Sequence, residues 1–137
     1  MHVVCKQTLL FTLWVFVLIN MIYADLLGML RPGYVEMLEQ MSRELSQGAV
    51  LFFAMMMEIT IVMIPLSRLL RRKANRRLHF VAIPLVIAWV VLPSLTGLGG
   101  ETQPSYIFFA TVEVATMLGM LWVISNWRAD EQLGTGR

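Results

Sequence analysis

The chain has 137 residues, of which 58% are hydrophobic and only 15% are charged, with a net charge of +2 and a single cysteine. Soluble domains are about 25% charged, so this composition indicates a membrane protein of one domain. The small net charge gives no reason to expect nucleic acid as a partner. One cysteine excludes an intrachain disulfide and a Cys-x-x-Cys redox pair.

Four apolar segments of about 20 residues follow one another along the chain. Each is long enough to cross about 30 Å of hydrocarbon as a helix. They run from about 8 to 28, 48 to 70, 78 to 98 and 104 to 127. We therefore predict an all-α membrane protein. A four-helix transmembrane bundle forms a single domain over residues 1–128, and residues 129–137 form a flexible cytoplasmic tail.

The connection between the first two segments has a pattern of its own. A helix-breaking Pro32-Gly33 pair is followed by apolar residues on one helical face, at Tyr34, Leu38, Met41 and Leu45. This spacing predicts a short amphipathic helix that lies on the outer surface of the membrane, in the first loop of the bundle.

Basic residues are concentrated between the second and third apolar segments. Six of the eleven lysines and arginines lie there or at the end of the second segment, namely Arg68, Arg71, Arg72, Lys73, Arg76 and Arg77. The positive-inside rule places this predicted loop, and with it both termini, in the cytoplasm. We expect the basic side chains to contact anionic lipid as well.

The third segment contains Pro84 and Pro93 but no ionisable residue in its interior. We therefore predict that it is the most lipid-facing helix. The first, second and fourth helices would then surround any polar site.

Two carboxylates lie in the middle of apolar segments, Glu58 in the second and Glu113 in the fourth. An acid at this depth costs several kcal/mol unless it is protonated, paired or hydrated, so such groups mark candidate functional sites. Counting about 1.5 Å per residue places both acids and Asn20 in one layer, where we predict that the acids face each other. The candidate ligand-binding residues are Asn20, Tyr23, Asp25, Glu58, Tyr106 and Glu113.

Other chemistries have weaker support. Met55, Met56 and Met57 carry thioethers that suit Cu(I), but consecutive helical residues point in different directions and cannot all bind one ion. The two histidines, His2 and His79, are expected at the cytoplasmic edge, away from the acids. A catalytic acid/base pair ranks behind ligand binding, and the sequence assigns no catalytic residue, metal ligand or cofactor.

Several short motifs together are similar to a known group of sequences. These motifs are Leu13–Asn20 with Tyr23–Asp25, Met57–Ile59, Pro65–Arg68 with Ala74–Arg76, and Tyr106–Phe109 with Val112–Glu113. The chain resembles, over about residues 8–127, an uncharacterised family of small bacterial four-span membrane proteins, a domain of unknown function. The resemblance implies a four-helix membrane fold in the bacterial inner membrane and names no activity. Small multidrug exporters also have four spans and a membrane glutamate, but theirs is in the first span, where this chain has Asn20 and Asp25.

Two functions are therefore expected from the sequence. The first is binding or transport of a small cationic or amphipathic molecule, with Glu58 and Glu113 as its charge partners. The second is a non-catalytic accessory role in a larger membrane complex, in which protonated acids only form hydrogen bonds between helices. The expected partners are the lipid bilayer, a small hydrophobic or cationic ligand, and other membrane subunits or further copies of the chain.

Overall fold

The computed structural model describes residues 5–96 and 104–127, which form five helices and no strand. The four long helices are α1 (Lys6–Met29), α3 (Gln47–Leu69), α4 (Arg72–Thr96) and α5 (Pro104–Ser125), and the short helix α2 (Tyr34–Glu44) lies between α1 and α3. All four long helices are long and apolar enough to cross a membrane. The predicted all-α bundle with a short amphipathic helix in the first loop is therefore confirmed. Residues 97–98 of the third predicted segment and the tail at 129–137 lie outside the described residues.

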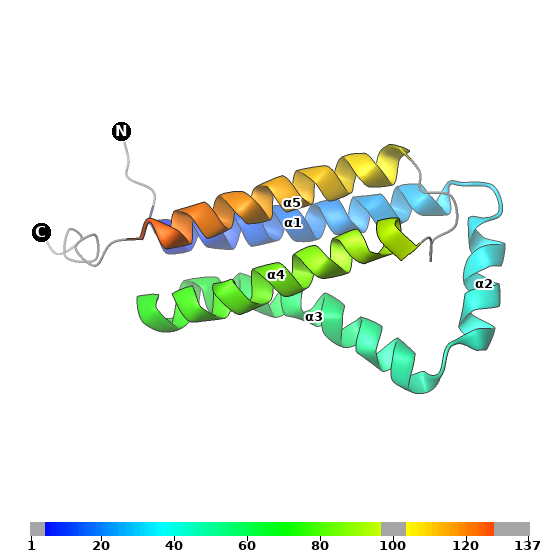
Figure 1. Ribbon diagram of the computed structural model, residues 1–137, viewed down its shortest axis with the longest axis horizontal. Helices are drawn as coiled ribbons and strands as arrows, with labels where there is room; N and C mark the ends of the chain where they lie inside the picture. The colour runs from blue at the N-terminus through cyan, green and yellow to red at the C-terminus, as the bar shows by residue number, and fades with distance from the viewer. Residues whose placement is uncertain (1–4, 97–103, 128–137) are drawn as a thin grey trace, which may run out of the picture.

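The four long helices pack around a shared core. Helix α1 packs against α3 and α5, and α4 packs against the same two helices, so α1 and α4 occupy opposite corners, as do α3 and α5 (Figure 1). The buried residues of α1 recur on one helical face, at Leu10, Trp14, Val17 and Met21. This stripe, together with buried residues of the other helices, forms one apolar core.

Helix α2 crosses one end of the bundle, which we call the α2 end (Figure 1). Gly33 precedes α2 with a φ of +79°, a left-handed conformation that glycine adopts without steric cost. Ser46 then caps α3, because its hydroxyl accepts a hydrogen bond of 3.2 Å from the Ala49 amide. The first half of α3 diverges from α1 and α5, so the bundle is more open at the α2 end (Figure 1).

The opposite end, which we call the basic end, is held together by side chains that reach helix carbonyls. The Lys6 Nζ atom donates to the carbonyl oxygen of Asn126 at 3.1 Å, and Gln7 Nε2 donates to that of Leu70 at 2.9 Å. The last carbonyls of a helix have no partner within it, so these bonds satisfy groups that the helix leaves free. They fasten α1 to the ends of α5 and α3.

The basic segment proves to be mostly helical. Helix α3 ends at Leu69 and α4 begins at Arg72, so the connection is a short turn and not the longer loop that was predicted. The guanidinium of Arg72 donates to the carbonyl oxygen of Trp127, which joins α4 to the end of α5. Arginine side chains therefore extend from helix ends at this surface, with those of Arg68 and Arg76 stacked over phenylalanine rings.

The prediction that the third span is the most lipid-facing is wrong. A third of the most apolar stretch of α4 is buried (33%), compared with 11% of that of α3, which is the most exposed of the four spans. The lack of charge misled the prediction, because α4 faces the core with uncharged polar residues, Asn75 and His79, as well as with apolar ones.

Candidate functional site

The structure brings together three of the predicted site residues in the half of the bundle toward the α2 end. Glu113 of α5 is only 3% exposed and interacts electrostatically with Asp25 of α1. Tyr106, two helical turns before Glu113, interacts electrostatically with both acids and with Tyr34 of α2. We call these four residues the acid–tyrosine cluster: Asp25, Tyr34, Tyr106 and Glu113.

Tyr34 was not among the predicted site residues, although the sequence placed it on the apolar face of the short helix. A Cβ atom added to Gly28 would lie 3.3 Å from Cζ of the Tyr34 ring, so the ring lies closely over α1 at a residue without a side chain. Burial raises the pKa of Tyr34 above its usual value, and the negative charge of Asp25 raises that pKa further. Both effects favour the neutral phenol, which is able to donate a hydrogen bond.

The cluster is rich in hydrogen-bond acceptors. The Tyr106 hydroxyl donates to the carbonyl oxygen of Val90 in α4 at 2.9 Å, which leaves its oxygen free to accept. Within residues 5–96 and 104–127, neither Asp25 nor Glu113 forms an ion pair with a basic side chain, and no group of three or more metal-binding side chains is present. The cluster therefore contains two carboxylates and two phenol oxygens, which are the kinds of acceptor that a cation prefers.

The other three predicted residues lie elsewhere. The side-chain nitrogen Nδ2 of Asn20 donates to the Phe16 carbonyl oxygen of its own helix at 2.8 Å. The side chain of Tyr23 is 56% exposed. Glu58 is exposed on α3 and makes no hydrogen bond or ion pair with any residue of the described segments.

Glu58 and Glu113 lie at similar depth but on helices that are not adjacent. The carbonyl groups of Leu70 and Asn126 mark the basic end of α3 and α5. Glu58 precedes Leu70 by 12 residues and Glu113 precedes Asn126 by 13, so each acid lies about 18–20 Å from that end. Since α3 and α5 do not pack together, the acids belong to two separate places.

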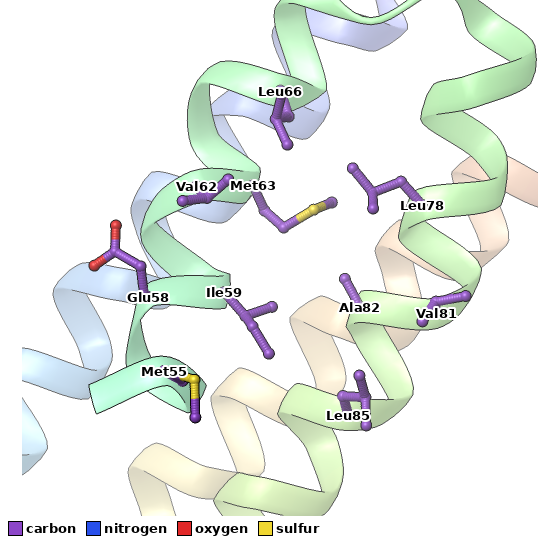
Figure 2. A pocket seen from close by; sticks show the side chains of 10 residues that line it. All are labelled: Met55, Glu58, Ile59, Val62, Met63, Leu66, Leu78, Val81, Ala82 and Leu85. Atoms are coloured by element: carbon purple, nitrogen blue, oxygen red, sulfur yellow. The ribbon is translucent and has the colours of Figure 1, made fainter. Parts of the chain in front are cut away.

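Glu58 lies at the edge of an apolar groove between α3 and α4, with a volume of about 360 Å³. Met63 and Ala82 are almost fully buried and form its floor, while Met55 and Val81 are more than half exposed and form its rim. Figure 2 shows the carboxylate of Glu58 turned away from the apolar side chains. We call this feature the α3–α4 groove; its lining is Met55, Glu58, Ile59, Val62, Met63, Leu66, Leu78, Val81, Ala82 and Leu85.

A buried polar network in the half of the bundle near the basic end was missed by the sequence analysis. Trp14 Nε1 donates to His79 Nε2 at 2.9 Å, and His79 Nδ1 lies 2.8 Å from the carbonyl oxygen of Asn75. Asn75 Nδ2 in turn donates to the carbonyl oxygen of Ser67 at 2.6 Å. Because Nε2 accepts from Trp14, the neutral imidazole carries its proton on Nδ1 and donates to Asn75. The network joins α1, α4 and α3, and all four of its residues are fully buried.

One sequence signal could have revealed this network. Asn75 and His79 are four residues apart and thus share a helical face with Ile83 and Val86, which are apolar. The predicted span began at residue 78, so Asn75 was assigned to a loop and His79 to the membrane edge.

The fold and the cluster together define a class: a four-helix protein built to cross a membrane, with an acid–tyrosine cluster at the α2 end. Residues 3–134 match DUF6326, a family of unknown function, and the chain belongs to this family. The comparisons with curated proteins and with solved structures find no match.

Proposed function

We propose that this protein binds or transports a small cationic or amphipathic molecule, and that the acid–tyrosine cluster is its binding site. The observation that carries the proposal is the buried Glu113 carboxyl, which interacts electrostatically with Asp25, with no basic side chain of the described segments paired to either acid. Two neighbouring carboxylates repel each other when both are ionised, so a bound cation would relieve their repulsion.

The chemistry of the cluster favours an amine. A primary ammonium group has three N–H donors and no acceptor. Asp25, Glu113 and the Tyr106 oxygen supply acceptors from two helices, and the Tyr34 hydroxyl lies on a third. Asp25 is exposed whereas Glu113 is buried, so the ligand would reach the inner acid from the α2 end.

The proposal is tested by titrating a short amine, such as butylamine, into the purified protein in neutral maltoside micelles. We expect saturable binding by calorimetry and at least about tenfold weaker binding by Glu113→Gln, which keeps the shape of the acid but cannot ionise. Glu39→Gln makes the same chemical change on the exposed face of α2 and should leave binding unchanged. If wild type and Glu113→Gln respond alike to the amine, the proposed site is wrong.

A second candidate function is an accessory subunit of a larger membrane complex, in which the acids are only hydrogen-bonding groups between helices. The observation that favours it is the apolar start of α3, where Val50, Leu51 and Phe52 are each at least half exposed. An accessory subunit of this kind would not bind amines, and Glu113→Gln would leave its thermal stability unchanged.

We also propose that the protein resides in the bacterial inner membrane with its basic end and both termini in the cytoplasm. The basic side chains that gather at this end support the orientation, since lysine and arginine are retained on the cytoplasmic side. The α2 end would then face outward.

A further inference from the structure

We infer that the α3–α4 groove is a second site, which binds the hydrocarbon chain of a cationic amphiphile whose ammonium head pairs with Glu58. This inference goes beyond the acid–tyrosine cluster, because α3, which carries Glu58, is not adjacent to α5, which carries Glu113. The two sites therefore use different residues and different faces of the bundle.

The shape of the groove suits a single chain. Its volume of about 360 Å³ is near the lower end of the roughly 300–1,000 Å³ that is usual for ligand pockets. Nine of its ten lining residues are apolar, and its floor at Met63 and Ala82 is part of the buried core. A hydrocarbon chain in the groove would contact apolar side chains from both α3 and α4 (Figure 2).

Charge decides which head group the chain should carry. Glu58 lies on the same face of α3 as the rim residues Met55 and Val62, three residues after the first and four before the second. A carboxylate in the middle of a membrane span is unfavourable unless it has a partner of opposite charge or another polar partner. A neutral lipid chain would fill the groove but leave Glu58 unpaired, and an anionic amphiphile would bring a like charge beside it.

The geometry also sets the position of the head. The Glu58 carboxylate points away from the floor of the groove (Figure 2). A bound amphiphile would therefore lay its chain between α3 and α4 and its ammonium over the α3 rim. Cation and chain are thus recognised by separate parts of the site, which allows each to be tested by its own substitution.

The experiment measures equilibrium binding of radiolabelled dodecyltrimethylammonium to the protein in phosphatidylcholine nanodiscs, with empty nanodiscs as the blank. Dodecyl maltoside and dodecyl sulfate, which carry the same chain on a neutral and an anionic head, serve as competitors. We expect saturable binding that neither competitor displaces at equal concentration, and about tenfold or more weaker binding by Glu58→Gln.

Two further substitutions test the groove itself. Ala82→Leu fills the floor of the groove, and Val81→Trp covers the floor from the exposed rim. Val81→Trp does not alter the buried core, so it keeps the test possible if Ala82→Leu fails to fold. Each should weaken binding of the dodecyl cation by about tenfold. Ala88→Leu, the same change at an exposed residue of α4 outside the groove, should not.

Equal binding by wild type and Glu58→Gln, or displacement by dodecyl maltoside, would mean that the chain only partitions into apolar surface, and the inference would be overturned. The two proposals fail separately. If butylamine binding depends on Glu113 while the Glu58 and Val81 variants bind dodecyltrimethylammonium as wild type does, the proposed function stands without the second site. If only the Glu58 and Val81 variants lose binding, the second site stands and the cluster proposal falls.

Discussion

The hydrogen bond between Trp14 and His79 crosses the bundle between two helices at opposite corners. Both side chains are fully buried, so neither nitrogen has access to water as a replacement partner. Removing one member of such a pair leaves the other unsatisfied, which costs about 1–3 kcal/mol. This makes Trp14 the anchor of the network near the basic end.

We expect Trp14→Phe to lower the free energy of unfolding by about 2–4 kcal/mol, because it removes both the donor and part of the packing. The measurement is reversible unfolding in mixed micelles. Trp122→Phe removes an indole that is 70% exposed and should change stability little. In a double-mutant cycle, His79→Phe should cost less in the Trp14→Phe protein than in wild type, and strict additivity would exclude coupling between the rings.

Thr60 presents the opposite situation. It is fully buried, and its hydroxyl oxygen has no hydrogen-bond partner among the described residues. An unsatisfied buried hydroxyl is unfavourable, and valine has nearly the same shape without it. We expect Thr60→Val to raise the free energy of unfolding by up to about 1 kcal/mol.

The matched control is Thr116→Val. The Thr116 hydroxyl donates to the Val112 carbonyl oxygen at 2.8 Å. Thr116→Val therefore loses a hydrogen bond, whereas Thr60→Val loses none. The free energy of unfolding of Thr116→Val should be unchanged or lower than that of wild type. If Thr60→Val destabilises the protein more than Thr116→Val, a partner for the Thr60 hydroxyl exists and the expectation is wrong.

At the scale of the elements, the sequence predicted α2 correctly but did not predict its contact with α1. The pair Pro32-Gly33 predicted the break, and Gly33 adopts the left-handed conformation there. What spacing within one helix cannot show is the return of the chain over its own preceding helix. Tyr34 was therefore read as part of a surface helix, whereas its ring lies over Gly28.

The position of Tyr34 predicts a pH dependence. Its pKa is raised in the folded state, first by burial and then by the charge of Asp25. In the unfolded chain tyrosine titrates near its ordinary pKa of about 10, so the unfolded state loses the proton first. The stability that Tyr34 contributes is therefore complete below about pH 10 and is lost as the pH rises above it.

We expect the melting temperature of wild type to fall more steeply between about pH 10 and 11 than that of Tyr34→Phe, which has no proton to lose. Asp25→Asn should give an intermediate slope, since burial remains while the charge is gone. Melting curves across this range in a detergent that does not titrate provide the measurement. Parallel curves for wild type and Tyr34→Phe would show that Tyr34 is not buried against α1.

For the molecule as a whole, composition and segment length were enough to predict four spanning helices. The arrangement of those helices was not predictable, because every span contains enough apolar residues to face either lipid or core. Glu113 and Glu58 illustrate this. Both interrupt apolar runs at a similar depth, yet one is 3% exposed and the other lies on the outer face of α3. The packing of α3 and of α5 against α1 and α4 decides that difference.

The orientation of the whole molecule is a prediction that the revised helix boundaries make easier to test. Cysteine labelling needs exposed positions at each end, in a Cys5→Ser background. Asn75 lies in the basic segment but is fully buried, which makes it unsuitable. Lys73 in the first turn of α4 and Gln40 in α2 are both exposed and lie at opposite ends of the bundle.

We expect a membrane-impermeant maleimide to label Gln40→Cys in intact bacterial cells, and to label Lys73→Cys only after the membrane is permeabilised. The reason is the concentration of arginine and lysine at the basic end, which is retained in the cytoplasm during insertion. Full labelling of both variants after denaturation controls for expression and thiol reactivity. Labelling of Lys73→Cys alone in intact cells would show that the topology is the reverse of the one proposed, and the acid–tyrosine cluster would then open toward the cytoplasm. Labelling of both would indicate insertion in two orientations, which the uneven distribution of basic residues argues against.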